Sequence, residues 1–188
     1  MTWLVSNIPL VLEVDDLVVR RYTTADASLL VDAVTASLPE LLQWMPWAKF
    51  EPQTVQQREE LIHTWIREWD NKSNFTMGIF KEGLCVGGTG FHLRGNVGEL
   101  EIGYWVSTPW TGRGIARRVS SALVDVAFEC PEVNVVSIAH DVANIASERI
   151  PMRLGFSVSR EYQREPEAPS ESGVARVWSV TREEWRRR

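Results

Sequence analysis

The sequence is poor in the side chains that hold metals and disulfide frameworks. Among 188 residues there are only two cysteines, Cys85 and Cys130, and three histidines, and no pair of them has the spacing of a metal-binding motif. We therefore expect two buried, reduced thiols and no metal. His63, His92 and His140 are expected to be structural or solvated.

Excess positive charge and long apolar runs are also missing. Twenty lysines and arginines stand against 25 acidic residues, a formal net charge of −5, so the chain lacks the basic field that a nucleic-acid backbone requires. No uncharged stretch reaches the roughly 18 residues of a membrane span, and residues 1–9 do not have the pattern of a signal peptide. We expect a cytoplasmic protein that binds neither nucleic acid nor membranes.

What the chain does contain is typical of one globular domain. Hydrophobic residues make up 44% and charged residues 24%, close to ordinary globular usage, and the length suits a single domain over residues 1–188. Nine tryptophans are unusual for this length. So much aromatic area is normally core, although part of it can line a pocket, and an exposed apolar edge would be compatible with a homodimer.

Hydrophobic periodicity predicts a mixture of strands and helices. The predicted strands span residues 11–14, 17–22, 75–80, 84–91, 100–106, 133–139, 157–163 and 174–180, and the predicted helices span residues 24–37, 54–69, 113–128 and 145–154. Residues 38–50 are interpreted as a loop or a broken helix, and residues 164–173 as a mobile polar loop. The strand–helix–strand order over residues 100–139 predicts two near-parallel neighbouring strands.

The most informative stretch is residues 99–118, where a predicted strand runs into a glycine loop and then a helix. Unpaired N–H groups and the positive end of the helix dipole make such a junction suitable for phosphate oxygens. Gly112 and Gly114 have no side chains to block a pyrophosphate, although an ordinary strand-to-helix turn would use the same glycines. The stretch is neither G-x-x-x-x-G-K-[ST] nor G-x-G-x-x-G, which argues against nucleotide hydrolysis and dinucleotide redox chemistry.

Four ordered motifs resemble those of one family. Residues 111–116 are similar to the acyl-CoA loop Q/R-x-x-G-x-G/A, with Gly114 and Ala116 in the small positions and Thr111 in place of the usual Gln or Arg. Further segments are similar at Asn144-x-x-Ser147 leading to Leu154-Gly155-Phe156, at Trp44-Met45-Pro46-Trp47 and at Glu101-Ile102-Gly103-Tyr104-Trp105. Over residues 17–185 the chain resembles the GNAT superfamily of acyl-CoA-dependent N-acetyltransferases, and within it the RimJ/RimL-type acetyltransferases of ribosomal-protein N-termini.

The resemblance implies the GNAT fold, an α+β fold with a mostly antiparallel sheet of about seven strands, splayed in the middle and flanked by about four helices. It implies acetyl-CoA as co-substrate and no metal. Val106 would lie near the pantetheine arm, and Arg113 and Arg117 would either add charge near the phosphates or remain solvated. The expected cofactor-binding residues are Tyr104, Trp105, Val106, Thr111, Gly112, Arg113, Gly114, Ile115, Ala116, Arg117, Asn144 and Ser147.

The resemblance also implies a direct acetyl transfer, which needs a proton acceptor for the amine and a hydrogen-bond donor for the departing thiolate. Glu99 and Glu101 alternate onto the same face of a strand, and motif position favours Glu101 as the catalytic base, directly or through water. Many members carry a tyrosine seven residues after the Asn. That position is Pro151 here, so Ser147 is the expected donor.

The acceptor is expected beside residues 38–50 and the helix at 54–69, with the substrate-binding residues Trp44, Trp47, Phe91 and Glu99. An α-amine with a pKa of about 7.7–8.0 is roughly one-tenth neutral at pH 7, whereas lysine, at about 10.4, is less than about 0.1% neutral. This favours a protein or peptide N-terminal α-amine over a small-molecule amine such as an antibiotic, a polyamine or an amino acid. Because Thr111 and Pro151 depart from the family pattern, a non-catalytic acyl-CoA-binding domain is the alternative from another class.

Overall fold

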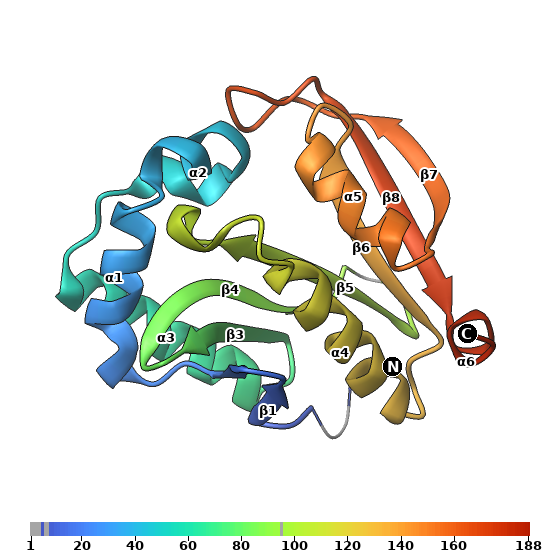
Figure 1. Ribbon diagram of the computed structural model, residues 1–188, viewed down its shortest axis with the longest axis horizontal. Coiled ribbons are helices and arrows are strands. Elements are labelled where there is room, and N and C mark those ends of the chain that lie inside the picture. The colour runs from blue at the N-terminus through green and yellow to red at the C-terminus, as the bar shows by residue number, and fades with distance from the viewer. Residues whose placement is uncertain (1–4, 6–7, 95) are drawn as a thin grey trace.

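A mixed sheet organises the computed structural model, which describes residue 5, residues 8–94 and residues 96–188 (Figure 1). Eight strands occur within those residues: β1 Val11–Val14, β2 Leu17–Arg21, β3 Asn74–Lys81, β4 Leu84–His92, β5 Glu99–Val106, β6 Val135–Asp141, β7 Ser157–Gln163 and β8 Val174–Thr181. Their order in the sheet is β1-β2-β3-β4-β5-β6-β8-β7. Neighbouring strands are antiparallel except β5 and β6, which are parallel, so the predicted crossover is confirmed.

Six α-helices lie in the described part of the chain: α1 Ala27–Thr35, α2 Leu38–Trp44, α3 Val55–Asp70, α4 Ile115–Glu129, α5 Ile145–Arg153 and α6 Arg182–Arg186. Figure 1 shows α4 and α5 in front of the sheet and α3 behind it. Thr54 begins α3 by accepting a hydrogen bond from the Gln57 N–H, and the Gln57 side chain bonds back to the Thr54 N–H. This reciprocal cap satisfies two backbone donors that a helix start leaves free.

The α+β class agrees with the sequence prediction, and the eight strands correspond to the eight segments that periodicity predicted. They are one more than the about seven implied by the family resemblance, and the six α-helices exceed the predicted four. Residues 38–50 form the broken helix, because α2 is followed by a separate 3₁₀ turn, Pro46–Phe50, and proline has no N–H to continue the helical ladder. The C-terminal helix α6, which Thr181 caps, was not predicted from the sequence.

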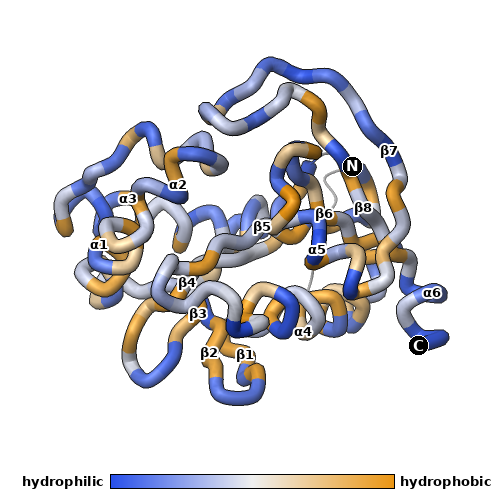
Figure 2. Tube along the Cα trace, turned by 45° about the horizontal axis from the view of Figure 1, so that its top comes forward, coloured by the Kyte–Doolittle hydropathy of each residue, from blue (hydrophilic) through white to orange (hydrophobic). Residues whose placement is uncertain are grey.

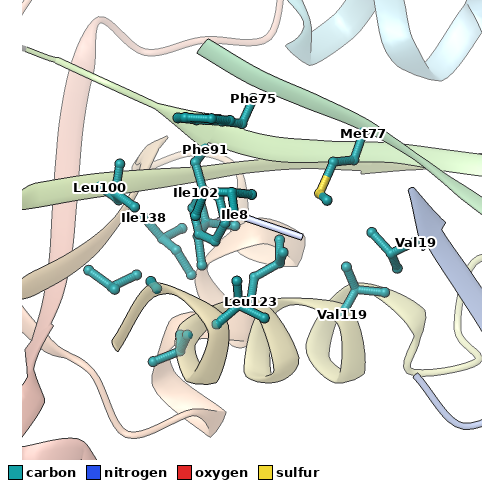
Figure 3. Packing of buried hydrophobic residues seen from close by; sticks show 14 of the residues in the cluster. Ile8, Val19, Phe75, Met77, Phe91, Leu100, Ile102, Val119, Leu123 and Ile138 are labelled. Carbon is teal, nitrogen blue, oxygen red and sulfur yellow. The ribbon is translucent and has the colours of Figure 1, made fainter. Parts of the chain in front are cut away.

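The larger hydrophobic core lies between the sheet and α4. Val119 and Leu123 of α4 have no exposed surface and meet Phe91, Leu100 and side chains of the neighbouring strands, as Figure 3 shows. Their spacing follows the three- and four-residue repeat expected of a buried helix face. A second cluster, which includes Tyr22, buries α1 and part of α3 against the other side of the sheet. Cys85 and Cys130 are both buried.

The β7–β8 loop, residues 164–173, is tied to two distant elements instead of being a mobile polar loop. It reaches across the top of the molecule toward α2 and is largely hydrophilic (Figures 1 and 2). Ser170 donates from its N–H to the Gln43 carbonyl at 3.1 Å and from its hydroxyl to Gln43 Oε1 at 2.7 Å. The Asp141 carboxylate accepts from the N–H groups of Ser172 and Gly173. The loop therefore bridges the two halves of the sheet.

Candidate functional site

The middle of the sheet opens between β5 and β6. These strands are paired at three positions, the last of which places Glu101 beside Ser137, and then diverge. A cavity of about 920 Å³ occupies the opening. The cavity is lined by polar side chains from three elements: Tyr104 of β5, His140 of β6 and Ser147 of α5.

The loop after β5 presents backbone N–H groups at the start of α4. Gly112 and Gly114 have φ angles of +74° and +73°, a left-handed conformation that glycine adopts without strain. A Cβ on either would meet nothing within 4 Å, so the loop is open on its outer side. Gly114 is the N-cap of α4 and no side-chain cap bond is found there in the described residues, which leaves first-turn donors for a ligand. This arrangement fits a pyrophosphate such as that of coenzyme A.

The remaining loop residues surround that junction. The Thr111 hydroxyl donates to the Thr108 carbonyl, and the Arg113 guanidinium donates to the Pro109 carbonyl while lying 4.6 Å from the Trp110 ring centre. Arg117 is exposed one turn into α4. Ile115 has its side chain buried in the core, so only its backbone faces a ligand, and Ala116 is half-buried.

Tyr104 and Ser147 meet across the opening. The Tyr104 hydroxyl lies 3.1 Å from both the Ser147 carbonyl oxygen and the Ser147 hydroxyl. Asn144 caps α5 by accepting from the Ser147 N–H at 3.0 Å, which fixes the serine in the first turn. Burial raises the pKa of Tyr104 to about 12, against a smaller lowering by its bond to Ser147. The phenol therefore keeps its proton and is available as a donor at neutral pH.

Glu101 and Glu99 occupy different surroundings although they share a strand face. The Glu101 carboxylate lines the cavity, is 18% exposed and accepts from Arg94 Nε at 2.9 Å. Glu99 is absent from the cavity lining, and its carboxylate accepts from the Asn96 amide at 2.7 Å. Glu99 begins the paired segment of β5 and β6, whereas Glu101 is its last paired residue, directly at the point where the strands diverge. Glu99 is thus not placed at a substrate surface.

Aromatic side chains form the wall on the side of α2 and α3. Trp44, Trp47 and Trp65 line the cavity, and the Trp47 and Trp105 rings lie with their centres 6.0 Å apart. Trp105 also lines the cavity, whereas Val106 packs against the main core. The placement of Phe91 on this wall is wrong. Its side chain points to the opposite face of the sheet, over α4, and has no exposed surface.

A buried ion pair lies behind the aromatic wall. Arg58 of α3 donates from Nη2 to Glu51 Oε1 at 2.5 Å, and both side chains are only 3% exposed. The other Glu51 oxygen accepts from the Gln53 N–H at 3.0 Å. The pair therefore joins α3 to the segment that follows the 3₁₀ turn and holds the cavity wall in place. The sequence pattern does not predict this pair, because a charged residue on an amphipathic helix ordinarily faces solvent.

A hydrogen-bonded chain at the end of β4 was also not predicted. His92 Nδ1 lies 2.7 Å from Asn74 Oδ1, and the Asn74 amide donates to Glu68 Oε2 at 3.2 Å. His92 and Asn74 line the cavity beside Glu101. Alternation along β4 places Gly88, Gly90 and His92 on one face, but only the register between strands shows that this face carries Glu101.

Within residues 5, 8–94 and 96–188, no group of three or more His, Cys, Asp or Glu side chains is arranged to hold a metal ion. None of the helices found in those residues is long and apolar enough to cross a membrane.

The family match covers most of the strands and helices that build this site. Residues 16–157 match the family described as "Acetyltransferase (GNAT) domain". The chain belongs to the GNAT acetyltransferase family. It is accordingly an acyltransferase, and its opened sheet is the central feature of the GNAT fold, as the sequence resemblance implied.

Comparison with known proteins finds three similar acetyltransferases. The "Putative ribosomal N-acetyltransferase YdaF" of Bacillus subtilis (strain 168) is 28% identical over 143 residues, which are 76% of this chain and 78% of YdaF. The microcin C7 self-immunity acetyltransferase MccE, solved with acetyl-CoA and AMP, has a TM-score of 0.84 at 18% identity, covering 93% of this chain and 97% of that one. RimL, the ribosomal L7/L12 α-N-protein acetyltransferase solved with coenzyme A, has a TM-score of 0.82 at 16% identity, covering 91% and 97%. The sequence similarity to YdaF agrees with the resemblance to the RimJ/RimL-type branch, and the RimL structure has the same fold.

Proposed function

We propose that this GNAT protein transfers an acetyl group from acetyl-CoA directly to the α-amine at the N-terminus of a protein or peptide. The main support for this proposal is the position of the candidate residues along β5. One strand brings Glu101 and Tyr104 into the cavity and then ends at the glycine loop that opens α4. A phosphate-binding loop and two groups suited to proton and hydrogen-bond chemistry are thus consecutive along one element.

The residues would divide the reaction as follows. Bound acetyl-CoA supplies an activated acetyl thioester. The amine nitrogen forms a bond to the acyl carbon, the carbon–sulfur bond breaks, and the proton lost by the nitrogen goes to Glu101, directly or through water. Ser147 donates a hydrogen bond from its hydroxyl to the departing sulfur, and the Tyr104 phenol, which stays protonated, donates to the Ser147 carbonyl oxygen and so holds this residue at the opening. The N–H groups of residues 112–116 bind the pyrophosphate, with Arg113 and Arg117 adjacent.

A small-molecule amine is the second candidate acceptor, and one observation favours it. The β7–β8 loop contacts α2 through Ser170 and Gln43, and Glu167 and Glu171 of the same loop line the cavity. The acceptor side is thereby bounded by the aromatic wall and by this loop, which suits a compact acceptor.

Turnover against a panel of amines tests the proposal. Thiol release from acetyl-CoA should occur with peptides that begin in serine or alanine, and not with lysine side chains alone. Free amino acids, polyamines and aminoglycosides in the same panel examine the small-molecule alternative. Transfer to a small amine without transfer to any peptide would refute the peptide assignment, and binding without any transfer would favour a non-catalytic domain.

Acetyl-CoA should also stabilise the protein against heat. A ligand at about 100 times its Kd adds roughly 2.7 kcal/mol to the free energy of unfolding, which for a domain of this size raises Tm by about 5–10 °C. Differential scanning fluorimetry with and without acetyl-CoA measures the shift. No shift at millimolar acetyl-CoA would contradict the assignment of the glycine loop.

Replacing Ser147 with alanine should lower kcat more than it weakens acetyl-CoA binding. A hydrogen bond to a group carrying charge contributes about 1.5–3 kcal/mol, which corresponds to a loss of roughly 10- to 100-fold in kcat. Steady-state kinetics with a saturating acceptor, beside a thermal shift by coenzyme A, separates the two effects. If affinity falls and kcat does not, Ser147 belongs to cofactor binding alone.

A further inference from the structure

His92 stands at the edge of the cavity, over a stretch of strand that has no side chain. It is the last residue of β4 and lies opposite Glu101 of β5 in the antiparallel register. A Cβ placed on Gly103 would come within 2.7 Å of His92 Nε2, so the imidazole edge lies directly over that glycine. His92, Glu101 and Gly103 all line the cavity. Gly103 therefore leaves open space beside the polar side chains of His92 and Glu101.

The hydrogen-bonded chain behind His92 determines which ring nitrogen carries the proton. A Glu68 carboxylate oxygen can only accept, so the Asn74 group facing it at 3.2 Å is the amide NH₂. The Asn74 carbonyl oxygen then faces His92 Nδ1 at 2.7 Å and also can only accept. Nδ1 must therefore carry the hydrogen, and a neutral His92 has its lone pair on Nε2.

The surroundings of His92 keep the ring neutral. Burial and, to a smaller extent, the positive charge of Arg94 together lower the pKa of His92 to about 4. The charged groups around it are Glu101 from β5, Arg94 just beyond β4, and Glu68 from α3, which acts through Asn74. The hydrogen bonds found in the described residues engage Nδ1, and none of them uses Nε2. At neutral pH, Nε2 is an acceptor available to a ligand in the cavity.

We propose that His92 Nε2 and the Glu101 carboxylate form the subsite for the reacting amine, over Gly103. This inference rests on the proposed acetyl transfer and specifies the chemistry of its nucleophile. A neutral primary amine has two N–H donors and one lone pair. When His92 and Glu101 accept those two hydrogen bonds, the lone pair remains free to attack the acyl carbon, and the proton released afterwards goes to Glu101.

The subsite predicts a preference for primary amines. A secondary amine has one N–H and leaves either His92 or Glu101 without a hydrogen bond, and a buried acceptor without a partner is costly. A peptide that begins with N-methylalanine should therefore have a kcat/KM roughly 3- to 10-fold or more below that of the matched alanine peptide. In His92→Phe this difference should shrink, because the second acceptor is gone.

The sharpest test changes the charge state of His92 from a distance. In Asn74→Asp a carboxylate accepts from Nδ1 and should raise the imidazole pKa by about 1–3 units, with Glu68→Gln made at the same time so that an amide and not a second carboxylate faces the new Asp. Protonated His92 has no lone pair with which to accept from the amine. Between pH 5 and 8, the kcat/KM of the variant should therefore fall more steeply with decreasing pH than that of wild type, because a second group must lose its proton. If His92 were purely structural, the substitution would change stability, or change kcat/KM equally at every pH, and the acid side of the pH profile would keep its shape.

The controls separate failure of the subsite from failure of the proposed function. His63→Gln, an exposed histidine on α3, should leave the profile unchanged. A thermal shift by acetyl-CoA reports folding of each variant, and ¹⁵N NMR of labelled histidine should find Nε2 unprotonated and shifted when an alanine peptide is added with coenzyme A. If wild type acetylates the peptide while the acid side of the variant's pH profile keeps its shape and the Nε2 resonance does not move, the subsite is wrong and the function stands. If neither transfer nor peptide binding occurs, the proposed function itself fails.

Discussion

Glu101→Gln should lower kcat by about 10²- to 10⁴-fold, the range expected when a general base is removed. Glutamine has nearly the same shape and can still accept from Arg94 Nε at its oxygen, so the wall of the cavity should be preserved. What it lacks is the negative charge and the capacity to take a proton from the amine. Stopped-time assays with saturating acetyl-CoA and acceptor measure the loss, and the thermal shift by acetyl-CoA should match that of wild type.

Glu99→Gln is the matched control for this prediction. Glu99 lies two residues earlier on the same face of β5, outside the cavity lining, with its carboxylate bonded to Asn96. Its kcat should stay within about twofold of wild type, because surface substitutions away from special features are usually close to neutral. Equal losses for both variants would point to the general charge of β5, and an unchanged kcat in Glu101→Gln would leave water as the proton acceptor.

Arg58→Met should lower the free energy of unfolding by about 3–5 kcal/mol, because it leaves the Glu51 carboxylate buried without its cation. For a domain of this length the loss corresponds to a Tm roughly 6–20 °C lower. The methionine fills most of the volume of the arginine stem, so lost packing contributes little. Urea unfolding followed by tryptophan fluorescence measures the change.

Two further variants identify the cause of that loss. The double variant Glu51→Leu with Arg58→Met removes both charges, and it should recover most of the stability, since buried pairs can often be exchanged for hydrophobic residues. Arg67→Met, on the exposed side of the same helix, should cost less than about 0.5 kcal/mol. A loss in Arg58→Met no larger than in Arg67→Met would show that the pair does not hold the cavity wall.

The sequence was sufficient for most of the secondary structure. Periodicity predicted α3 and α4 because their apolar residues recur at three and four positions, and the β-branched run at residues 133–139 predicted β6. It predicted α4 two residues too early, since Gly112 and Gly114 adopt left-handed angles and delay the helix to Ile115. It did not predict α6, which is one short turn rich in arginine and held by a cap.

The site was partly predictable for a similar reason. Gly112, Gly114, Glu101 and Ser147 were predicted as site residues because each belongs to a short motif whose spacing is local. His92, Asn74 and Arg58 belong to no such motif, and their roles depend on partners 6 to 18 positions away in the chain. Hydrogen bonds of that kind cannot be inferred from the identity of one residue.

The sequence by itself determined that a strand ends in a glycine loop and a helix, and that this order resembles a GNAT protein. Only the tertiary structure decided which neighbours in sequence share a site. Phe91 and His92 are adjacent, yet strand alternation sends one into the core over α4 and the other into the cavity. The choice between the two faces depends on the register of β4 with β5 and on which face α4 covers, and both are set by packing between distant segments.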